Sequence, residues 1–521
     1  MTFATELAAA RAAQAAGVRL PIRERLRPVR TLRDLLVRRA DDLIAAAHAD
    51  IGRPAVEVVG TELLPSAAAL KFIEQEAVRV LAPRRVPGRL RPTWLMGSRD
   101  VVHRRPWGVV GVIGTWNYPI FLNVGPIAQA LVAGNAVLWK PSENAPRTAD
   151  VTHDLFRSAG FAADLLQKLP ATREAGPQLA EANVDYVVFT GSDGVGRKLA
   201  ARLGERLIPS TLELSGCDAM FVLADANVEM AARAAWFGLT LNRGQTCIAV
   251  RRVYVERSLY AAFTARLREF VAKASPVSLV TPGQATQAQR LIADAESRGA
   301  LRLVPSPLAG EGGESSSRVK GEVVREGEAH PSPAGGAPAP SPARGEGTNQ
   351  NGVAPTFLLN VPPEAAICRE ACFAPVAGVI PFDAIDDALA RAAKSPFGLS
   401  ASVFTADAAA AQQLAARIPS GSVVINDVLA PTAHPATPFG GLGASGWGVT
   451  QGPEGLLAMT APQVVTVRKG SFRPHLDEAV SPDPATADIL RGLLRATHAR
   501  GLGERLRGAW QLVRGVRRKQ K

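Results

Sequence analysis

Apolar residues follow two different spacings along the chain, and the spacing changes near residue 107. Through residues 1–81, Ala, Leu and Val recur every three or four positions between charged residues. That spacing predicts amphipathic helices. From residue 107 onward, short apolar runs alternate with helical stretches, which predicts an α/β fold with a mainly parallel sheet. The runs are VVGVIG (109–114), AVLWK (136–140), YVVFTG (186–191), AMFVL (219–223) and RVYVE (252–256).

Two stretches need separate treatment. Residues 83–106 carry four prolines, which favour extended or looped chain. Residues 107–139 contain no charged residue, and a membrane-spanning helix needs about 20 apolar residues. Gly, Pro and Asn interrupt this stretch repeatedly. It therefore predicts buried strands and a buried helix joined by a tight polar loop.

Residues 304–352 do not fit the α/β pattern. They are rich in Pro, Gly, Ser and Glu, and PSPLAGEG (305–312) recurs as PSPARGEG (340–347), with six of eight residues identical. Such a composition does not bury enough apolar surface to offset the entropy lost on ordering. We predict a disordered surface insert, and a docking segment is the alternative.

Composition and charge narrow the class of protein. Four cysteines in 521 residues do not make a disulfide framework, and they fit a reducing, cytosolic setting. The net charge is +13, but from Arg491 to the end there are ten Arg or Lys residues against one acid, Glu504. The rest of the chain is therefore near neutral, so nucleic acid is not expected as a partner.

The basic tail carries its own signal. Residues 489–518 place leucines and Trp510 among arginines, and a basic amphipathic helix of this kind can lie on an anionic membrane surface. Four glycines weaken a continuous helix. A solvated tail, or one that docks on another subunit, is the alternative.

Polar residues follow the predicted strands where ligands bind to open α/β sheets. Asn117, in TWNYP (115–119), could aim its amide at a ligand oxygen, or it is an ordinary turn residue. Lys140 and Glu143, in WKPSE, could bind ribose hydroxyls, or they lie in a solvated loop. Gly191 and Ser192 open a glycine turn before a helix, whose N–H groups could bind a diphosphate.

Glu213 and Cys247 are the candidates for chemistry. Glu213 lies between leucines in LELSG, and burial raises the pKa of a carboxyl toward the range of a general base. The alternative is a solvent-facing Glu on an edge strand. A helix that begins near Asn227 leads to NRGQTCI (242–248). Cys247 is then either a packed thiol or a nucleophile at a helix-to-loop junction.

These motifs, in this order and spacing, resemble the aldehyde dehydrogenase superfamily from about residue 5 to 495, apart from the insert. The resemblance continues through PTFLL (355–359), FAPV (373–376), Asn426-Asp and PFGGLGASG (438–446). The sequence looks most like the branch that contains fatty aldehyde dehydrogenases. The implied fold has a Rossmann-type cofactor domain, an α/β catalytic domain and a small bridging or oligomerisation element.

The resemblance implies roles for nine residues. Cys247 matches the nucleophile, Asn117 the oxyanion donor beside the Cys247 backbone N–H, and Glu213 the residue that activates water. Lys140 and Glu143 match contacts to the adenosine ribose, and Gly191 and Ser192 match the pyrophosphate turn. Trp116 and Phe373 match aromatic residues of the cofactor site. The expected cofactor is NAD, with NADP as the alternative, and no metal is expected.

Three departures from the family pattern stand out. Where the family usually has Glu-Glu-x-Phe-Gly-Pro, this chain has Glu370-Ala-Cys-Phe-Ala-Pro, so Ala371 replaces the Glu that usually binds the nicotinamide ribose. Glu370 lies one residue away, and successive residues of a strand point to opposite faces. Cys217 stands where a Lys is usual, and the insert falls in the part that matches the catalytic domain.

The resemblance also implies an organisation and a cellular setting. The predicted parts are N-terminal helices that pack on the cofactor domain (1–81), the NAD(P)-binding domain (82–212), the catalytic domain (213–425, with the insert), the return and bridging element (426–470) and the basic tail (471–521). We expect a cytoplasmic homodimer that oxidises an aldehyde, with membrane contact through 489–521. The alternatives are an acyl-CoA-linked reductase and a catalytically weak binding protein.

Overall fold

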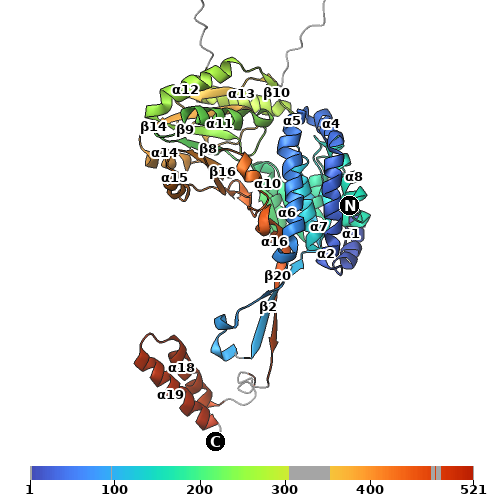
Figure 1. The fold of residues 1–521 in the computed structure, drawn as a ribbon, viewed down its shortest axis with the longest axis vertical. Helices are drawn as coiled ribbons and strands as arrows, with labels where there is room; N and C mark the ends of the chain where they lie inside the picture. The colour runs from blue at the N-terminus through green and yellow to red at the C-terminus, as the bar shows by residue number, and fades with distance from the viewer. Residues whose placement is uncertain (1–2, 96, 304–351, 471–475, 477–482, 520–521) are drawn as a thin grey trace, which may run out of the picture. The chain divides into compact units, whose positions relative to one another are not determined.

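The computed structural model describes residues 3–95, 97–303, 352–470, 476 and 483–519 (Figure 1). Contacts divide the chain into two compact units: Met1–Ala82 with Arg104–Gln463, and Pro83–His103 with Val464–Lys521. The first unit holds every candidate site residue. The segment predicted as an insert lies outside the described residues except for Gly352, which is in strand β12 and pairs with β10. The domain boundaries drawn from the sequence stay predictions.

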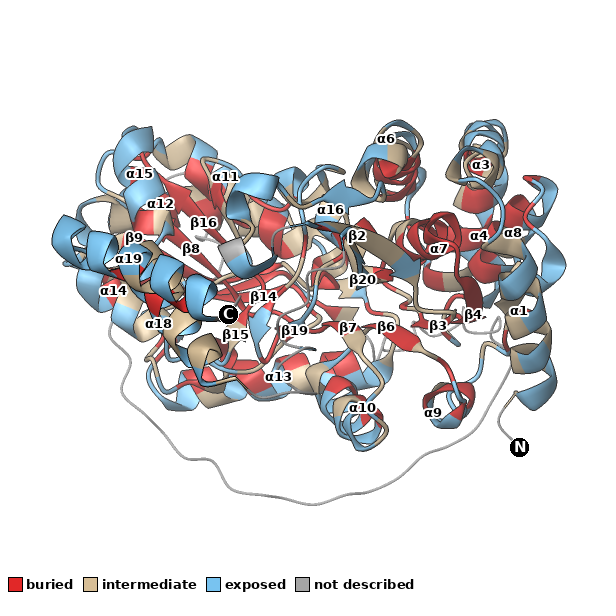
Figure 2. Ribbon diagram, turned by 90° about the horizontal axis from the view of Figure 1, so that it is seen from below, coloured by how far each residue is buried: buried red, intermediate tan, exposed pale blue. Residues whose placement is uncertain are grey.

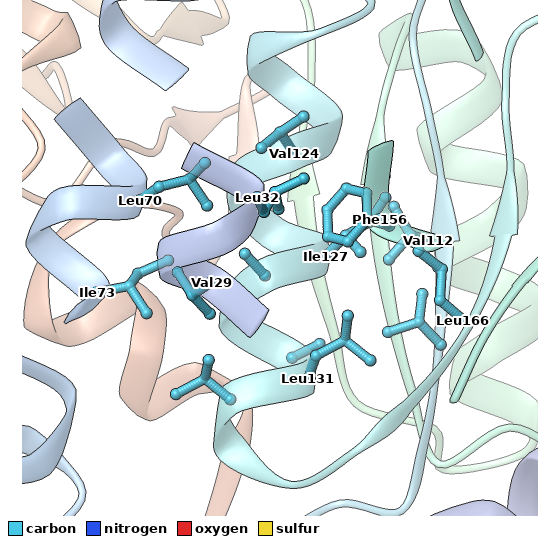
Figure 3. Close-up of a cluster of buried hydrophobic side chains, with 14 of the residues drawn as sticks. Val29, Leu32, Leu70, Ile73, Val112, Val124, Ile127, Leu131, Phe156 and Leu166 are labelled. Carbon is cyan, nitrogen blue, oxygen red and sulfur yellow. The ribbon is translucent and has the colours of Figure 1, made fainter. Parts of the chain in front are cut away.

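The N-terminal part is helical, as predicted. In α3, the buried residues Val29, Leu32 and Leu36 recur at helical spacing and form one apolar stripe. Figure 3 shows Val29 and Leu32 beside side chains of α6 and α7. The elements are α1 (Ala4–Gly17), α2 (Ile22–Arg25), α3 (Arg27–Arg38), α4 (Ala40–Ile51), α5 (Ala55–Val58), the π-helix η1 (Val59–Leu63) and α6 (Leu64–Val80).

The first sheet has the strand order β19-β7-β6-β3-β4-β5. All neighbours are parallel except β19, which runs antiparallel to β7. Helices α7 and α8 lie on one face of the sheet, and α9 and α10 lie on the other (Figure 2). The strands are β3 (Val109–Ile113), β4 (Ala136–Lys140), β5 (Leu166–Lys168), β6 (Tyr186–Thr190), β7 (Ser210–Glu213) and β19 (Gly446–Trp447); the helices are α7 (Phe121–Ala133), α8 (Pro146–Ser158), α9 (Ala175–Glu181) and α10 (Asp193–Glu205).

The second sheet has the order β11-β13-β14-β9-β8-β16-β17 and is parallel except for β11. Alternation along β8 sends Met220 and Val222 into the core under α11 and α12, and Phe221 into the core under α13. The strands are β8 (Asp218–Val222), β9 (Val250–Glu256), β11 (Leu301–Arg302), β13 (Thr356–Leu359), β14 (Val376–Phe382), β16 (Ser400–Phe404) and β17 (Ser422–Ile425). The helices are α11 (Val228–Thr240), α12 (Arg257–Ala272), α13 (Pro282–Ser297), α14 (Ile385–Ala392) and α15 (Ala408–Ala415).

The α/β prediction is therefore confirmed, and all five predicted runs are strands of these two sheets. The uncharged stretch 107–139 forms β3, α7 and β4, which are buried through most of their length. Within the described residues, no helix is long and apolar enough to cross a membrane. Shorter elements complete the first unit: β10 (Val277–Ser278), β12 (Gly352–Val353), β15 (Phe397–Gly398), β18 (Leu442–Gly443), α16 (Gly452–Ala458) and the 3₁₀ turns η4 (Ala163–Leu165), η5 (Leu241–Gly244), η6 (Ala366–Cys368) and η7 (Ala430–Ala433).

The second unit contains β1 (Arg84–Arg85) and most of β2 (Ser98–Pro106) and β20 (Thr460–Arg468), whose remaining residues belong to the first unit. β1 pairs antiparallel with β2, and β20 lies on the other side of β2. It also contains the short turns η2 (Gly88–Leu90) and η3 (Thr93–Leu95) and two packed helices, α18 (Pro484–His498) and α19 (Leu502–Lys519). The sequence predicted that glycines would weaken a helix here. The segment is interrupted between His498 and Leu502, where Gly501 lies. Two of those glycines, Gly508 and Gly515, lie with Gly492 where the two helices touch, because a Cβ on any of the three would lie 2.4–2.7 Å from the opposite helix.

Candidate active site

Cys247 and Glu213 meet at the point where the chain passes from the first sheet to the second. Glu213 is the last residue of β7, and Cys247 lies between η5 and β9. The Cys247 Sγ donates a hydrogen bond to the Glu213 Oε1 at 3.6 Å. Two residues 34 positions apart in the sequence thus form one thiol–carboxylate pair.

The turn before Cys247 has an unusual backbone. Helix α11 is capped by Asn227, whose Oδ1 accepts the Met230 N–H at 2.9 Å, and it ends at Thr240. Then Asn242, Arg243 and Gly244 have φ values of 50°, 58° and 73°. Left-handed backbone at residues other than glycine costs free energy and clusters at functional sites.

Gly244 is required at this turn for steric reasons as well. A Cβ there would lie 2.5 Å from the backbone of Ala374. The loop before β14 therefore packs directly on the turn that carries the candidate nucleophile.

Glu213 is only 2 % exposed, so it is not the solvent-facing residue that the sequence left open. Burial raises the pKa of Glu213 to about 7, although hydrogen bonds from Cys247 and Thr190 act to lower it. A carboxyl with this pKa is partly ionised at neutral pH and can both accept and return a proton.

The Cys247 thiol is protonated in this arrangement. Burial, followed by the nearby Glu213 carboxylate, raises the pKa of Cys247 well above its usual value. Glu213 is the hydrogen-bonded acceptor for the proton that the thiol must lose before it can attack.

Asn117 lies in the turn between β3 and α7 and is buried. Its Oδ1 accepts a hydrogen bond from the Thr115 Oγ1 at 2.7 Å, which fixes the direction of the amide. The Nδ2 then faces the Cys247 loop and donates to the Gln245 carbonyl at 3.1 Å. The second hydrogen of this NH₂ group can serve a ligand oxygen.

The remaining candidates lie along the carboxyl edge of the first sheet. Lys140 ends β4, and its Nζ is 3.1 Å from the Glu143 Oε2, so the two groups form a pair. Gly191 follows β6, and Ser192 caps α10 by accepting the Val195 N–H at 3.4 Å. Because β3, β4, β6 and β7 are parallel neighbours, the residues that follow them share one edge of the sheet.

These residues suit a dinucleotide cofactor. A side chain at Gly191 would collide with the ring of Phe189 at 2.4 Å, so this turn needs glycine. The N–H groups at the N-terminus of α10 that follows can bind a diphosphate. Lys140 and Glu143 supply a donor and an acceptor for ribose hydroxyls. Trp116 and Phe373, far apart in sequence, bring their ring centroids to 6.2 Å with 60° between the planes.

Ala371 has no substitute among its neighbours in the described structure. Glu370 lies in the loop before β14, not in a strand as the sequence suggested, and its carboxylate pairs with Arg290 of α13. The Ala371 carbonyl accepts a hydrogen bond from the Gln287 Nε2 at 2.9 Å. The loop is therefore held in place by α13, but no carboxylate replaces the usual Glu.

The other three cysteines are buried and free. The Cys217 Sγ donates to the Ile367 carbonyl at 3.4 Å, and the Cys217 carbonyl accepts from the Arg252 Nε at 2.9 Å. Among the residues that the structure describes, no group of three or more His, Cys, Asp or Glu side chains could hold a metal ion.

Sequence reasoning missed the residues that hold the site together. Thr190 ends β6, and its Oγ1 donates to the Glu213 Oε2 at 3.5 Å. Arg251 is fully buried, and its Nη1 donates to the Ala374 carbonyl at 2.5 Å, beside the Cys247 turn. The position of Thr190 just before Gly191 was a usable signal, whereas nothing local marks Arg251.

Two α/β sheets with a partly buried thiol–carboxylate pair where the chain passes between them fit an NAD(P)-dependent oxidoreductase, and the comparisons show this class. The sequence model of the aldehyde dehydrogenase family matches residues 2–325 and 314–465. The chain belongs to this family and is an aldehyde dehydrogenase.

Individual relatives agree with this assignment. The 4,4'-diapolycopene aldehyde oxidase of a Methylomonas species is 33 % identical, over 85 % of this chain and 77 % of its own length. A putative succinate-semialdehyde dehydrogenase [NADP(+)] of Mycolicibacterium smegmatis is 31 % identical over 89 % and 84 %. The crystal structure of a Mycobacterium tuberculosis aldehyde dehydrogenase complexed with NAD+ has a TM-score of 0.76 and 29 % identity, over 90 % of both chains.

Proposed function

We propose that this enzyme oxidises an apolar aldehyde to the carboxylic acid through an acyl-thioester on Cys247. The observation that carries the proposal is the contact between the partly exposed Cys247 thiol and the buried Glu213 carboxyl, with the Asn117 amide bonded to the loop that carries Cys247. Within the family, the sequence features favour the branch that contains fatty aldehyde dehydrogenases.

In the first half of the reaction, the Cys247 sulfur attacks the aldehyde carbonyl carbon, and Glu213 takes the thiol proton. The oxygen of the resulting thiohemiacetal carries negative charge, which the Asn117 Nδ2 and the Cys247 backbone N–H stabilise. Collapse of this oxyanion to the thioester expels the aldehyde hydrogen with its electron pair. The nicotinamide cofactor, when bound, supplies the acceptor for that pair.

In the second half, Glu213 gives its proton to solvent and becomes a carboxylate again. It then accepts a proton from a water molecule whose oxygen attacks the thioester carbon. The C–S bond breaks, the sulfur recovers a proton from Glu213, and the carboxylic acid leaves. A pKa of about 7 allows Glu213 to take and return protons in both halves.

The candidate cofactor residues take their roles from their positions along the carboxyl edge of the first sheet. Lys140 and Glu143 would hold the adenosine ribose, and Gly191 and Ser192 with the N-terminus of α10 would hold the pyrophosphate. Trp116 and Phe373 would flank the nicotinamide end. NAD is the first choice because Glu143 can accept a hydrogen bond from a free 2′-hydroxyl, and NADP is the alternative.

The lining of a small cavity beside Glu213 supports an apolar substrate. Side chains of α6 and α7 line it, among them Phe72, Ile73, Phe121 and Leu122, and its lining includes no Lys or Arg. A carboxylate-bearing aldehyde would need a cation to offset its desolvation. Cys247 and Asn117 do not line this cavity, so it describes the surroundings of Glu213, and the choice of a hydrocarbon-rich aldehyde over one such as succinate semialdehyde rests mainly on the resemblance to the fatty aldehyde branch.

The test is a panel of aldehydes, from short to long chain and including succinate semialdehyde, offered with NAD or NADP. Absorbance of the reduced cofactor reports turnover, and Cys247→Ala is the control. We expect reduction that disappears in the control and that favours longer, uncharged aldehydes. If the folded protein reduces neither cofactor with any aldehyde, the alternative of a catalytically weak binding protein is favoured. Ala371 and Cys217, which depart from the family pattern, support that alternative.

Analysis of the reaction product distinguishes hydrolysis of the thioester from transfer of the acyl group to coenzyme A. The presence of Glu213 favours water over coenzyme A as the acyl acceptor. Free acid as the sole product in the presence of added coenzyme A supports hydrolysis, and acyl-CoA would assign the chain to the other reaction type.

We propose further that the enzyme is a cytoplasmic homodimer that contacts the membrane surface through residues 489–521. The apolar side chains that support this are more than half exposed on α18 and α19: Leu490, Leu494, Leu502, Leu506, Trp510 and Val513. The Arg514 guanidinium lies 5.2 Å from the centre of the Trp510 ring, and basic residues around an exposed Trp suit an anionic lipid surface.

Sedimentation with anionic liposomes, with and without residues 484–521, tests the membrane contact. Equal sedimentation of the two forms would rule it out. Light scattering of the same two proteins gives the subunit number and tests the homodimer.

A further inference from the structure

A buried ion pair in the N-terminal helical layer reaches the turn that carries Asn117. Arg53 follows α4, Glu62 lies in η1, and neither is more than 1 % exposed. The Arg53 Nη1 donates to the Glu62 Oε1 at 2.8 Å. Removal of two charges from water is offset only when the pair makes further good polar contacts. The further polar contacts of Arg53 and Glu62 identify the segment of backbone that the pair holds in place.

Both members of the pair bind the backbone between β3 and α7. The Arg53 Nη1 also donates to the Asn117 carbonyl at 2.9 Å, and the guanidinium carbon lies 4.2 Å from the centre of the Tyr118 ring. The Glu62 Oε2 accepts the N–H groups of residues 120 and 121 at 2.6 and 3.2 Å. The turn is therefore bound at both of its ends.

The same turn is tied to the loop of the nucleophile. The Asn242 Nδ2 donates to the Asn117 carbonyl at 2.9 Å, which is the oxygen that Arg53 also binds. The Tyr118 hydroxyl is 2.7 Å from the Thr246 Oγ1, one residue before Cys247. The position of the Asn117 amide relative to the sulfur thus depends on the backbone that Arg53 and Glu62 hold.

We propose that Arg53 and Glu62 are positioning residues that place the Asn117 amide over the developing oxyanion. The inference rests on the proposed function of Asn117 and Cys247. Neither side chain contacts the thiol, and both act through the backbone of the Asn117 turn. A misplacement of about 1 Å in a catalytic group can cost about 10²-fold in rate, so the pair has a catalytic consequence beyond its part in the fold.

Single substitutions in the full-length enzyme give the first test. Arg53→Lys keeps the charge but loses the planar fork that reaches two acceptors at once. Glu62→Gln removes the carboxylate that orients it. We expect each to lower kcat about 10- to 100-fold and to change KM for NAD by a smaller factor, because the candidate contacts to the adenosine ribose and the pyrophosphate lie on other turns and only Trp116 shares this one.

A double-mutant cycle with Asn117→Ala separates positioning from general damage to the fold. If the pair acts through the Asn117 amide, Glu62→Gln slows the Asn117→Ala enzyme by less than about threefold. If Glu62→Gln costs the same factor in both backgrounds, the proposal is wrong. The cycle is measured on aldehyde oxidation and on cofactor-free hydrolysis of 4-nitrophenyl acetate, which uses the same sulfur and the same oxyanion donors.

Two further variants keep the test decisive. The double variant Arg53→Met/Glu62→Met removes both charges of the pair together, so neither stays buried without the other. Arg53 also lies 3.5 Å from Glu57, whose side chain is 25 % exposed and keeps contact with solvent. We expect the double variant to fold and to show the same loss of kcat. Glu74→Gln is the matched control. Glu74 lies on α6 in the same helical layer, and it pairs with Arg33 at 2.7 Å rather than with the Asn117 turn.

Full activity of the folded Met/Met enzyme would overturn the proposal. Absence of aldehyde oxidation in the wild type, with ester hydrolysis intact, would instead count against the proposed function alone.

Discussion

At the scale of single residues, the burial of Glu213 decides what the Cys247 thiol can do. The carboxyl is hydrogen-bonded to the sulfur and shielded from solvent, so one group serves both halves of the reaction. Glu213→Gln should lower steady-state kcat about 10²- to 10³-fold, because neither the thiol nor the attacking water has a base to take its proton. Mass spectrometry of the wild-type enzyme mixed with aldehyde and NAD should show an acyl adduct on Cys247, and the variant should form this adduct more slowly. A variant that turns over normally would remove Glu213 from the mechanism.

The pKa of Glu213 gives a pH dependence of known direction. Burial raises the pKa of Glu213 to about 7, and only the carboxylate form accepts a proton from water. We therefore expect kcat to rise about tenfold per pH unit below pH 7 and to level off above it. The profile is measured at saturating aldehyde and NAD. A flat profile between pH 5.5 and 8 would contradict the assignment of Glu213 as the base.

Ala371 is the departure from the family pattern that the structure leaves uncompensated. If the missing carboxylate would contact the nicotinamide ribose, Ala371→Glu should lower KM for the cofactor about tenfold, as expected for one charge-assisted hydrogen bond of about 1.5 kcal/mol. Glu370→Gln is the matched control and should leave KM unchanged, because Glu370 pairs with Arg290 instead. An unchanged KM in Ala371→Glu would place the ribose elsewhere.

At the scale of elements, the apolar runs predicted the strands well because a buried parallel strand needs little besides apolar side chains. The edge that carries Asn117 and Lys140 could also be predicted, since Asn117 follows such a run and Lys140 ends one. Glu213 was found from its place between leucines, and its burial was left open. The left-handed turn before Cys247 could not be predicted as a whole, because Asn242 and Gly244 tolerate that backbone in many contexts and Arg243 does not favour it on its own. Contacts from distant segments hold them there, and no local pattern records those contacts.

The same turn gives a prediction about stability. Gly244→Ala should destabilise the protein by about 1–3 kcal/mol from the left-handed backbone alone, and more from the clash with Ala374. Thermal unfolding and kcat should fall together, because the turn carries the nucleophile. Gly283→Ala is the control: a Cβ at this position in α13 meets nothing within 4 Å, and Ala favours a helix over Gly.

At the scale of the whole molecule, the long segment 304–351 follows β11, an edge strand of the second sheet, and precedes β12, which pairs with β10 in a two-stranded sheet. Arg302 in β11 pairs with Leu358 of β13, and Gly352 pairs with Ser278 of β10. Gly352 lies six positions before Leu358, so a linker of about eight residues could close the gap. We expect such a replacement to keep kcat and to raise the free energy of unfolding by about 1–2 kcal/mol through loop-closure entropy.

That replacement also tests the docking alternative for the segment. A folded, stable variant that loses activity, or loses membrane sedimentation, would show that the segment contributes to function. The composition alone predicts the opposite, because nothing in it favours a fixed structure.

The unequal burial of the four cysteines has a practical consequence. Cys217, Cys368 and Cys372 are buried, and Cys247 alone is partly open to solvent. A small electrophile such as iodoacetamide, added to the native enzyme, should therefore attach once, at the candidate nucleophile. The same reagent after denaturation should attach four times. The mean number of adducts per chain, one for folded protein and four for unfolded protein, would therefore measure the folded fraction of any preparation. The measurement needs no substrate and no knowledge of which aldehyde the enzyme prefers.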